Sequence, residues 1–251
     1  MSSPDASAAP SPAPAVVCER VSKVYPGAQP VVALDSVGVS VAPGEFLAVV
    51  GPSGGGKSTL LHLLAGIDRP TSGSITVGGR ELSSSSESQL TLYRRRDVGV
   101  VFQFFNLLPH LTVRENVELP RLLDGRRDAS ARAAELLDRV DLARRRDAHP
   151  YELSGGEMQR AAVARALVTG ARLLLADEPT GNLDSRHGEE VLALLDEVRR
   201  ERGVTVILAT HSENAARRAD RIVELHDGRI LPSSTPGRGP GDGEGALLPP
   251  A

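Results

Sequence analysis

The sequence is poor in cysteine, in aromatic residues and in long apolar runs, and each shortage excludes a class of protein. A single thiol, Cys18, cannot form a disulfide within the chain, and the first fourteen residues lack the basic and apolar segments of a secretory signal. The longest uninterrupted apolar runs, at 46–50 and 191–195, have five residues, whereas a membrane-spanning helix needs roughly 20. We therefore expect a protein of a reducing compartment that does not span a bilayer by itself.

Charge of one sign is not in excess either. The 29 lysines and arginines face 32 aspartates and glutamates, for a net charge of −3. No overall positive field is available to hold nucleic acid, so we expect no nucleic-acid partner. Lysine itself is rare, because only Lys23 and Lys57 are lysines and the other 27 basic residues are arginines. A chain that uses arginine wherever chemistry permits predicts that a remaining lysine occupies a site that requires one.

What the sequence does contain is an alternation of apolar runs and helical patterns, which predicts an α/β fold between residues 15 and 232. The flanking segments, 1–14 and 233–251, are rich in proline, glycine and serine and are predicted to be flexible tails. In the first part of the chain we expect antiparallel strands within 16–82, with a hairpin at Gly78-Gly79 and a central strand at 46–50. A strand at 98–102 and helices within 104–160 follow. The last part is predicted to contain a strand at 173–176, a helix from Ser185 to a C-cap at Gly203, a strand at 204–209 and a hairpin at Asp227-Gly228.

A glycine-rich segment follows the central strand and precedes a helical pattern. Its residues fit the pattern GxxxxGK[ST] and are Gly51, Pro52, Ser53, Gly54, Gly55, Gly56, Lys57, Ser58 and Thr59. Glycines allow successive backbone N–H groups to turn toward phosphates, the helix N-terminus adds partial positive charge, and Lys57 reaches the β and γ phosphates. The Ser58 hydroxyl offers an oxygen to Mg²⁺. The segment therefore predicts a P-loop for ATP and Mg²⁺, and its context disfavours the alternative of a flexible turn.

Two later strands end in groups suited to the same chemistry. The strand at 173–176 leads into Asp177 and Glu178, and the strand at 204–209 leads toward His211. Ligands of parallel α/β sheets bind at the carboxyl ends of the strands. We therefore expect Asp177 to hold Mg²⁺ through water, Glu178 to polarise the attacking water and His211 to contact the γ-phosphate. Each residue alone is commonplace after a strand, but with the P-loop they predict a nucleoside triphosphatase.

The segment LSGGEMQR at 153–160 resembles the signature motif of the ATP-binding cassette (ABC) proteins. Ser154, Gly155 and Gly156 open a helical pattern and so form a second helix N-terminus that can bind an anion. In the ABC family, the P-loop of one subunit and the signature of another enclose each ATP. The resemblance, which extends over about residues 16–231, implies a homodimer in the ATP-bound state and an enzyme that hydrolyses ATP to ADP and phosphate.

The resemblance also implies a fold and further site residues. The fold is that of a P-loop NTPase with a RecA-like core of mainly parallel sheet, an N-terminal antiparallel β portion and a helical subdomain inserted at about 104–160. The matching residues are Tyr25, for the aromatic that stacks on adenine; Gln103, for the glutamine that contacts Mg²⁺ and senses the γ-phosphate; Glu178, for the general base; Asp184, for a loop that crosses the dimer interface, with helix capping as the alternative role; and His211, for the switch histidine.

Two positions depart from the family pattern. Met158 stands where relatives usually carry glutamine, which replaces one polar contact near the interface by a thioether. Gly55 stands where serine is common, which we expect to make the P-loop more flexible without removing a backbone donor. Neither change removes a phosphate ligand, so we expect a modest effect.

Within the family, the residues around Gln103 and the segment EPTGNLD at 178–184 resemble the branch of lipoprotein-releasing, macrolide-export, antimicrobial-peptide-resistance and cell-division ATPases. This resemblance implies a separate membrane permease, the export or release of a lipid-linked, peptide or drug-like substrate, and a cytoplasmic location on the inner face of the membrane. Three of the four phenylalanines, Phe102, Phe104 and Phe105, lie around Gln103 at the end of the strand predicted at 98–102. We expect the permease to dock there, between Gln103 and Pro109, with Phe105 at the contact.

Other readings remain beside transport. The same catalytic residues would serve an ATPase that pulls on a membrane partner to control a cell-wall enzyme outside the cell, without transport. ABC proteins that act on DNA or ribosomes fit poorly, because the chain has no long coiled coil, no second cassette and no basic surface. A P-loop kinase would leave the segment at 153–160 without a purpose.

Overall fold

A central, mainly parallel sheet positions most of the residues that the sequence singles out. The computed structural model describes residues 13–231, and the tails predicted at 1–14 and 233–251 lie outside the described residues apart from Ala13 and Pro14. The sheet has the order β10-β9-β3-β8-β7-β6, and only β10 runs antiparallel to its neighbour. Its strands are β3 (Phe46–Val50), β6 (Val98–Val101), β7 (Leu173–Asp177), β8 (Thr205–Thr210), β9 (Arg221–His226) and β10 (Arg229–Ile230).

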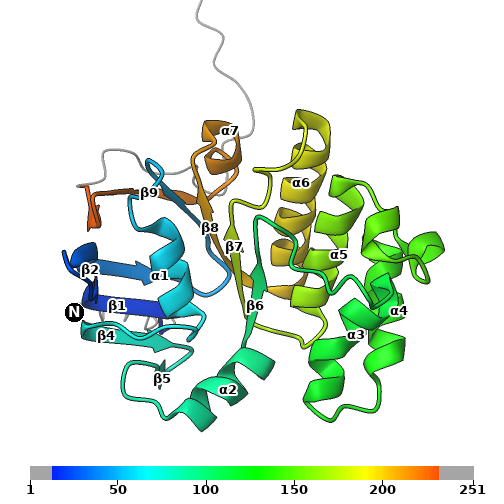
Figure 1. Ribbon diagram of the computed structural model, residues 1–251, viewed down its shortest axis with the longest axis horizontal. Coiled ribbons are helices and arrows are strands. Elements are labelled where there is room, and N and C mark those ends of the chain that lie inside the picture. Colours follow the sequence, from blue (N-terminus) through cyan, green and yellow to red (C-terminus); the bar gives the residue numbers. More distant parts are fainter. Residues whose placement is uncertain (1–12, 232–251) are drawn as a thin grey trace, which may run out of the picture.

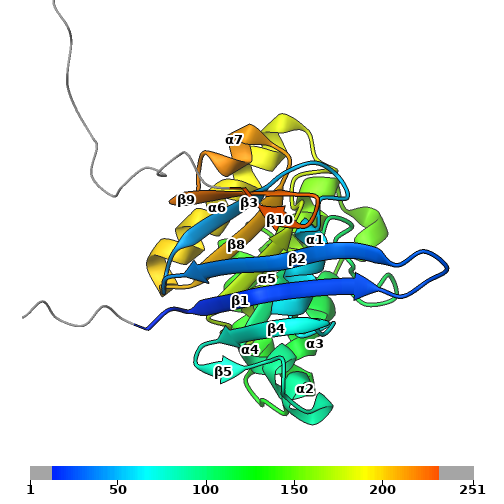
Figure 2. The same ribbon diagram turned by 90° about the vertical axis from the view of Figure 1, so that its left-hand side faces the viewer.

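A second sheet is antiparallel and is built from the N-terminal part of the chain. Its order is β2-β1-β4-β5, and Figure 2 shows β1, β2 and β4 lying side by side across one side of the molecule. Gly78 and Gly79, with φ of 55° and 79°, form the predicted turn between β4 and β5. The strands are β1 (Val16–Tyr25), β2 (Val31–Val41), β4 (Ser72–Val77) and β5 (Arg80–Glu81).

Helices lie on both faces of the central sheet (Figure 1). The first, α1, packs between the two sheets, whereas α5 and α6 cover the opposite face and α3 and α4 pack against α5. The helices are α1 (Lys57–Leu64), α2 (Glu87–Arg96), α3 (Val113–Leu123), α4 (Ala129–Arg139), α5 (Gly155–Leu167), α6 (Ser185–Arg202) and α7 (Glu213–Ala216), with 3₁₀ turns η1 (Ala143–Arg145) and η2 (Pro150–Glu152).

Alternation along the central strands divides the apolar core in two. In β3, Phe46 and Ala48 pack on the side of α3, α5 and α6, whereas Leu47 and Val49 pack on the side of α1 and the antiparallel sheet. Each of these four side chains is at most 1% exposed. Apolar side chains on both faces explain why the central strands read as continuous apolar runs. The strand ends are therefore held from two sides.

The mainly parallel core and the antiparallel N-terminal portion confirm the predicted fold class. The helix that begins at Ser185 ends at Gly203 in a left-handed C-cap with φ of 63°, as predicted. Within residues 13–231, no helix combines the length and apolar character needed to cross a membrane.

Strand boundaries differ from the predictions by one residue. The strand predicted at 98–102 ends at Val101, so Phe102 already belongs to the following segment. The strand predicted at 204–209 spans Thr205–Thr210. Two helices and both 3₁₀ turns fall within 104–160, and the boundaries of a helical subdomain there stay a prediction.

Candidate active site

The carboxyl ends of β3, β6, β7 and β8 meet at one edge of the central sheet. The register pairs Val101 of β6 with Ala176 of β7, and Val50 of β3 with Thr210 of β8. The strands therefore end nearly level, where parallel α/β sheets bind their ligands. The groups at these ends are the P-loop after β3, Gln103 after β6, Asp177 and Glu178 at the end of β7, and His211 after β8.

Neighbouring backbone explains two of the P-loop glycines. At Gly51, where φ is 147°, an added Cβ would lie 2.0 Å from the carbonyl oxygen of Leu225 in β9. At Gly56, where φ is 103°, an added Cβ would lie 2.4 Å from the carbonyl oxygen of Ala33 in β2. Both positions exclude a residue with a side chain, because the conformation and the space are available only to glycine.

Gly55 is enclosed as well. An added Cβ would lie 3.0 Å from the carbonyl oxygen of Leu225 and 3.1 Å from that of Pro52. The Gly55 N–H donates to the Pro52 oxygen at 3.1 Å, and the Gly55 oxygen accepts from the Gly228 N–H at 3.1 Å. The β9–β10 hairpin therefore holds the loop from outside, and a more flexible P-loop due to Gly55 stays a prediction.

Lys57 is the first residue of α1 and is 7% exposed. Its Nζ donates to the carbonyl oxygens of Gly51 at 2.9 Å and Pro52 at 3.0 Å, and lies 3.9 Å from Oε1 of Glu178. An ammonium carries three N–H donors. These bonds therefore orient the group and leave a donor for a ligand in the cleft.

Ser58 and Asp177 come together from the P-loop and β7. The Ser58 hydroxyl donates to Oδ1 of Asp177 at 3.1 Å. Burial raises the pKa of Asp177 above its ordinary value, although the bond from Ser58 opposes the shift. Two adjacent hard oxygen donors, one of them a partly desolvated carboxylate, are a donor set that Mg²⁺ prefers.

Glu178 is held at several points. Its backbone is left-handed, with φ of 45°, which costs on the order of 1 kcal/mol in a residue other than glycine. The Glu178 N–H donates to the Ala209 oxygen at 2.9 Å. In the side chain, Oε1 lies 2.9 Å from Nδ1 of His211, and Oε2 accepts from the Thr210 hydroxyl at 3.3 Å. The carboxylate is therefore fixed at the end of β7 with 14% of the side chain exposed.

Two side chains that the sequence analysis missed hold the segment after β6. Asn182 donates to the carbonyl oxygen of Gln103 at 2.8 Å. Arg165 of α5 donates to the carbonyl oxygens of Phe105, at 2.7 Å, and Asn106, and both of these residues have positive φ. The available signal for Arg165 was a charged residue inside the apolar stretch AAVARALV.

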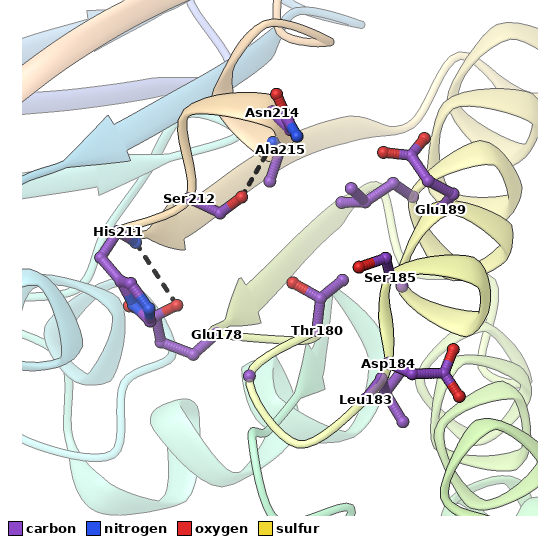
Figure 3. A pocket seen from close by; sticks show the side chains of 13 residues that line it. Glu178, Thr180, Leu183, Asp184, Ser185, Glu189, His211, Ser212, Asn214 and Ala215 are labelled. Carbon is purple, nitrogen blue, oxygen red and sulfur yellow. Dashed lines mark hydrogen bonds and ion pairs between the residues drawn. The ribbon is translucent and has the colours of Figure 1, made fainter.

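Most of the P-loop residues, together with Gln103, Glu178 and His211, line one cleft, whereas Asp177, Asn182 and Arg165 are not among its lining residues. Its walls combine apolar residues of β2 with the phosphate-loop segment and the residues at the other strand ends, namely Val31, Val32, Ala33, Ser53, Gly54, Gly56, Lys57, Ser58, Thr59, Gln103, Glu178 and His211. A second hollow lies on the other side of Glu178, between the β7–α6 loop and the β8–α7 turn (Figure 3). Glu178 and His211 thus separate two recesses.

The signature segment forms the N-terminus of α5. Ser154 caps this helix by accepting from the Glu157 N–H at 3.3 Å, while its own N–H donates to Oε2 of Glu157 at 2.8 Å. An added Cβ at Gly156 would lie 2.7 Å from Cδ2 of His187 in α6. Among residues 13–231, the lining of the P-loop cleft includes none of Ser154, Gly155 and Gly156. The two predicted anion-binding ends, at the P-loop and at the N-terminus of α5, therefore do not line the same cleft.

Comparison with known protein families gives a match to "ABC transporter" over residues 34–181, more than half of the chain. The chain belongs to the ABC transporter family. It is an ATP-binding domain of this family, whose members hydrolyse ATP, and the sequence resemblance is confirmed.

Relatives of this ABC protein cover most of its length. The lipoprotein-releasing system ATP-binding protein LolD of Geobacter metallireducens is 50% identical over 200 residues, 79% of this chain and 89% of that protein. The macrolide export ATP-binding/permease protein MacB of Salmonella typhimurium is 47% identical over 215 residues, 84% of this chain and 33% of MacB. The dimeric ATP-binding cassette MJ0796 bound to ADP and Pi has a TM-score of 0.83 and 40% identity, covering 89% of this chain and 99% of that chain.

In this ABC protein, Asp184 caps α6. Its Oδ1 accepts from the His187 N–H at 2.9 Å, and its Oδ2 lies 2.7 Å from Nδ1 of His187. Hydrogen bonds from His187 hold the pKa of Asp184 below its ordinary value. The capping role is thus present in the structure, and a role at a dimer interface stays a prediction.

Tyr25 ends β1 and pairs with Val31 across the β1–β2 hairpin. Val31 lines the P-loop cleft and is 60% exposed, and the Tyr25 side chain is 37% exposed. The ABC protein therefore presents an aromatic ring next to the apolar end of the cleft. Stacking of this ring on adenine stays a prediction.

The two phenylalanines that follow Gln103 differ in exposure. Phe104 is 71% exposed and lies at the surface. Phe105 is half-buried, with its ring end 3.9 Å from the position of a Cβ on Gly155. A role of Phe105 as the permease contact stays a prediction. The left-handed backbone that Arg165 holds turns this ring toward α5.

Proposed function

We propose that this ABC protein binds ATP with Mg²⁺ in the P-loop cleft and hydrolyses it as one half of a homodimer. The dimer would drive a membrane permease from the cytoplasmic face of the membrane. One observation carries this proposal: the P-loop residues, Gln103, Glu178 and His211 come from four strand ends and line one cleft. The N-terminus of α5, which carries the signature segment, lies outside this cleft. The names of LolD and MacB support the export or release of a lipid-linked, peptide or drug-like substrate.

The P-loop supplies the positive potential for the phosphates. Backbone N–H groups and the N-terminus of α1 face an anion without a desolvation cost from mobile side chains. Lys57, oriented by the Gly51 and Pro52 carbonyls, donates its remaining N–H to the β and γ phosphates. The ribose and adenine then extend toward Val31 and Tyr25.

Ser58 and Asp177 would hold Mg²⁺, with the side-chain oxygen of Gln103 as a further ligand. Their oxygen chemistry and the 3.1 Å bond between the first two fit this ion. When bound, Mg²⁺ neutralises phosphate charge in the transferred group. Gln103 lies on the segment that Asn182 and Arg165 hold, so contact at the nucleotide is transmitted to the surface at Phe104.

Glu178 acts on the attacking water. Its carboxylate accepts the proton as the water oxygen forms a bond to the γ-phosphorus and the bond to the β–γ bridging oxygen breaks. His211, 2.9 Å from Oε1, fixes the carboxylate and contacts the γ-phosphate. The strained backbone of Glu178 keeps the acid at one position instead of several.

A second copy supplies the missing half of the site. Ser154, Gly155 and Gly156 bind the γ-phosphate held by the partner's P-loop, and Asp184 lies at the crossing between the two chains. The similarity to a dimeric cassette with ADP and Pi supports this arrangement.

Mixing two inactive variants tests the shared site. Lys57→Ala and Ser154→Arg each damage one half, so a heterodimer of the two contains one intact site. We expect neither variant to hydrolyse ATP alone and the mixture to recover part of the phosphate release, up to about a quarter of the wild-type rate, because random pairing makes half of the dimers heterodimers and each heterodimer has one intact site of two. Full activity of Ser154→Arg by itself would refute the shared site.

The permease would dock in a groove between α1, β6 and α5. The groove is lined mainly by apolar residues: Ala65, Ile67, Arg94, Val98, Gly99, Val100, Phe102, Pro120, Arg165, Ala166 and Thr169. Phe104, exposed two residues after Phe102, lies on the segment that leads from this groove. An exposed aromatic next to an apolar groove is typical of a binding hot spot.

Phe104→Asp tests the docking surface. We expect the variant to fold and bind ATP normally but to lose about 2 kcal/mol or more of permease binding, because a charge replaces an apolar anchor. Binding is measured by titration of the detergent-solubilised permease encoded with this chain. The control is Tyr151→Asp, which removes an aromatic of similar exposure, 76% against 71%. Equal binding of Phe104→Asp and wild type would contradict the docking site.

A further inference from the structure

Lys23 is a lysine that the phosphate site leaves unexplained. The chain has 27 arginines and two lysines, and one of the two, Lys57, lies in the P-loop. The other, Lys23, lies in β1 with its side chain 12% exposed. A retained lysine in such a chain points to a position where an arginine does not serve.

The surroundings of Lys23 match the geometry of an ammonium. Its Nζ donates to Oδ1 of Asp68 at 2.6 Å and to the carbonyl oxygen of Arg69 at 2.9 Å. The same nitrogen lies over the ring of Tyr25, 4.9 Å from the centroid. Three N–H donors thus face a carboxylate, a carbonyl and an aromatic face. A planar guanidinium is too broad to satisfy all three from one point.

Asp68 connects this cation to the tyrosine. Its Oδ2 accepts from the Tyr25 hydroxyl at 3.2 Å, while Oδ1 accepts from Lys23. The Tyr25 ring is therefore fixed at two points, by the ammonium over its face and by the carboxylate at its hydroxyl. Burial acts to raise the pKa of Asp68, but the bonds from Lys23, the Arg69 N–H and Tyr25 together lower it, which keeps the carboxylate ionised.

The network also reaches the helix that begins at the P-loop. The N–H groups of Ile67 and Asp68 both donate to the carbonyl oxygen of His62 in α1, at 3.0 and 3.4 Å. Asp68 is thereby attached to the C-terminal end of this helix. The position of Tyr25 relative to the P-loop is set through Lys23 and Asp68 and not by β1 alone.

We propose that Lys23, acting with Asp68, is a positioning residue for Tyr25 and so determines the affinity for the adenine base. The inference rests on the proposed stacking of Tyr25 on adenine. The ammonium occupies one face of the ring, and the hydroxyl bond prevents rotation out of the cleft edge. The opposite face is then presented to the base without a conformational search, which lowers the entropy cost of stacking.

Binding of ATP and of inorganic tripolyphosphate to the full chain distinguishes this role from a general structural one. Calorimetry in EDTA measures both without hydrolysis. For Lys23→Met we expect about fivefold weaker ATP binding, the scale of a cation–π contact, and unchanged tripolyphosphate binding. Steady-state hydrolysis should show a raised KM with kcat retained. Lys23→Arg keeps the charge and should recover only part of the ATP affinity.

Three further variants separate the possible failures. Arg139→Met removes an ion pair with Glu201 in the helical part and should change neither ligand's affinity. If Tyr25→Ala leaves ATP affinity unchanged, the adenine site itself is wrong. If Tyr25→Ala weakens ATP binding while Lys23→Met and Asp68→Asn do not, the positioning role is refuted. An equal loss of affinity for ATP and for tripolyphosphate would also refute the positioning role. If Lys23→Met does not fold, the same comparison of ATP with tripolyphosphate affinity is made with Lys23→Arg and Asp68→Asn.

Discussion

Glu178→Gln is expected to reduce ATP turnover about 10²- to 10⁴-fold, the usual contribution of a general base. The amide keeps the size and shape of the side chain and its place beside His211, but it cannot accept the proton of the attacking water. ATP affinity should stay close to that of the wild type, because the phosphate ligands in the P-loop are untouched. Phosphate release under saturating ATP measures the turnover, and nucleotide titration measures the affinity for ATP.

The same variant should accumulate as an ATP-bound dimer. In the proposed cycle hydrolysis separates the two copies, so a chain that binds ATP but does not hydrolyse it is expected to stay paired. Sizing chromatography with ATP and Mg²⁺ detects this state, and only monomer in that experiment would contradict the shared site. Glu189→Gln is the matched control, because Glu189 is a carboxylate at the neighbouring recess that pairs with Arg218. It should turn over ATP at the wild-type rate.

Lys57→Ala is expected to weaken ATP binding about 10- to 100-fold, the range of one or two hydrogen bonds to a charged group. The alanine leaves the phosphate charge uncompensated in a cleft where the lysine is 7% exposed. Nucleotide titration measures the loss, and thermal unfolding without nucleotide shows whether the variant is folded. Unchanged ATP affinity would remove Lys57 from the site.

Lys57→Arg sharpens this test. It retains the positive charge but places a planar fork where the carbonyls of Gly51 and Pro52 converge on one nitrogen. We expect most of the ATP affinity to be lost again. Wild-type affinity in this variant would show that charge alone suffices, and that the rarity of lysine in the chain carries no information about the site.

The sequence alone was sufficient to predict elements whose structure depends only on the residues of one segment. The strand at 46–50 is buried on both faces, so its continuous apolar run and the glycine-rich segment after it identify β3 and the P-loop without further information. The Gly203 C-cap and the Gly78-Gly79 turn depend on local backbone conformation and were also predictable. Motif residues at strand ends reached the same cleft because parallel strands share one carboxyl edge.

The sequence was insufficient where contacts with a segment distant in the chain determine the local structure. The exposure of Phe104 and the half-buried position of Phe105 go with a left-handed turn whose carbonyl oxygens accept hydrogen bonds from Arg165 of α5. Two adjacent phenylalanines in a sequence do not indicate which of the two rings is exposed. The contacts of Gly55 with β9 and Gly228 likewise come from a distant segment, and the glycine-rich stretch around Gly55 does not indicate them. The Lys23–Asp68 contact likewise joins residues from different elements.

The hold of the β9–β10 hairpin on the P-loop sets an order of events during synthesis. The ribosome completes β3 and the glycine-rich segment before Leu225 and Gly228, which enclose that segment, have been synthesised. Until then the nascent chain lacks the walls that give the loop its shape. Nucleotide stabilises only a chain that can bind it. We therefore expect that ATP does not stabilise a chain that lacks the β9–β10 hairpin.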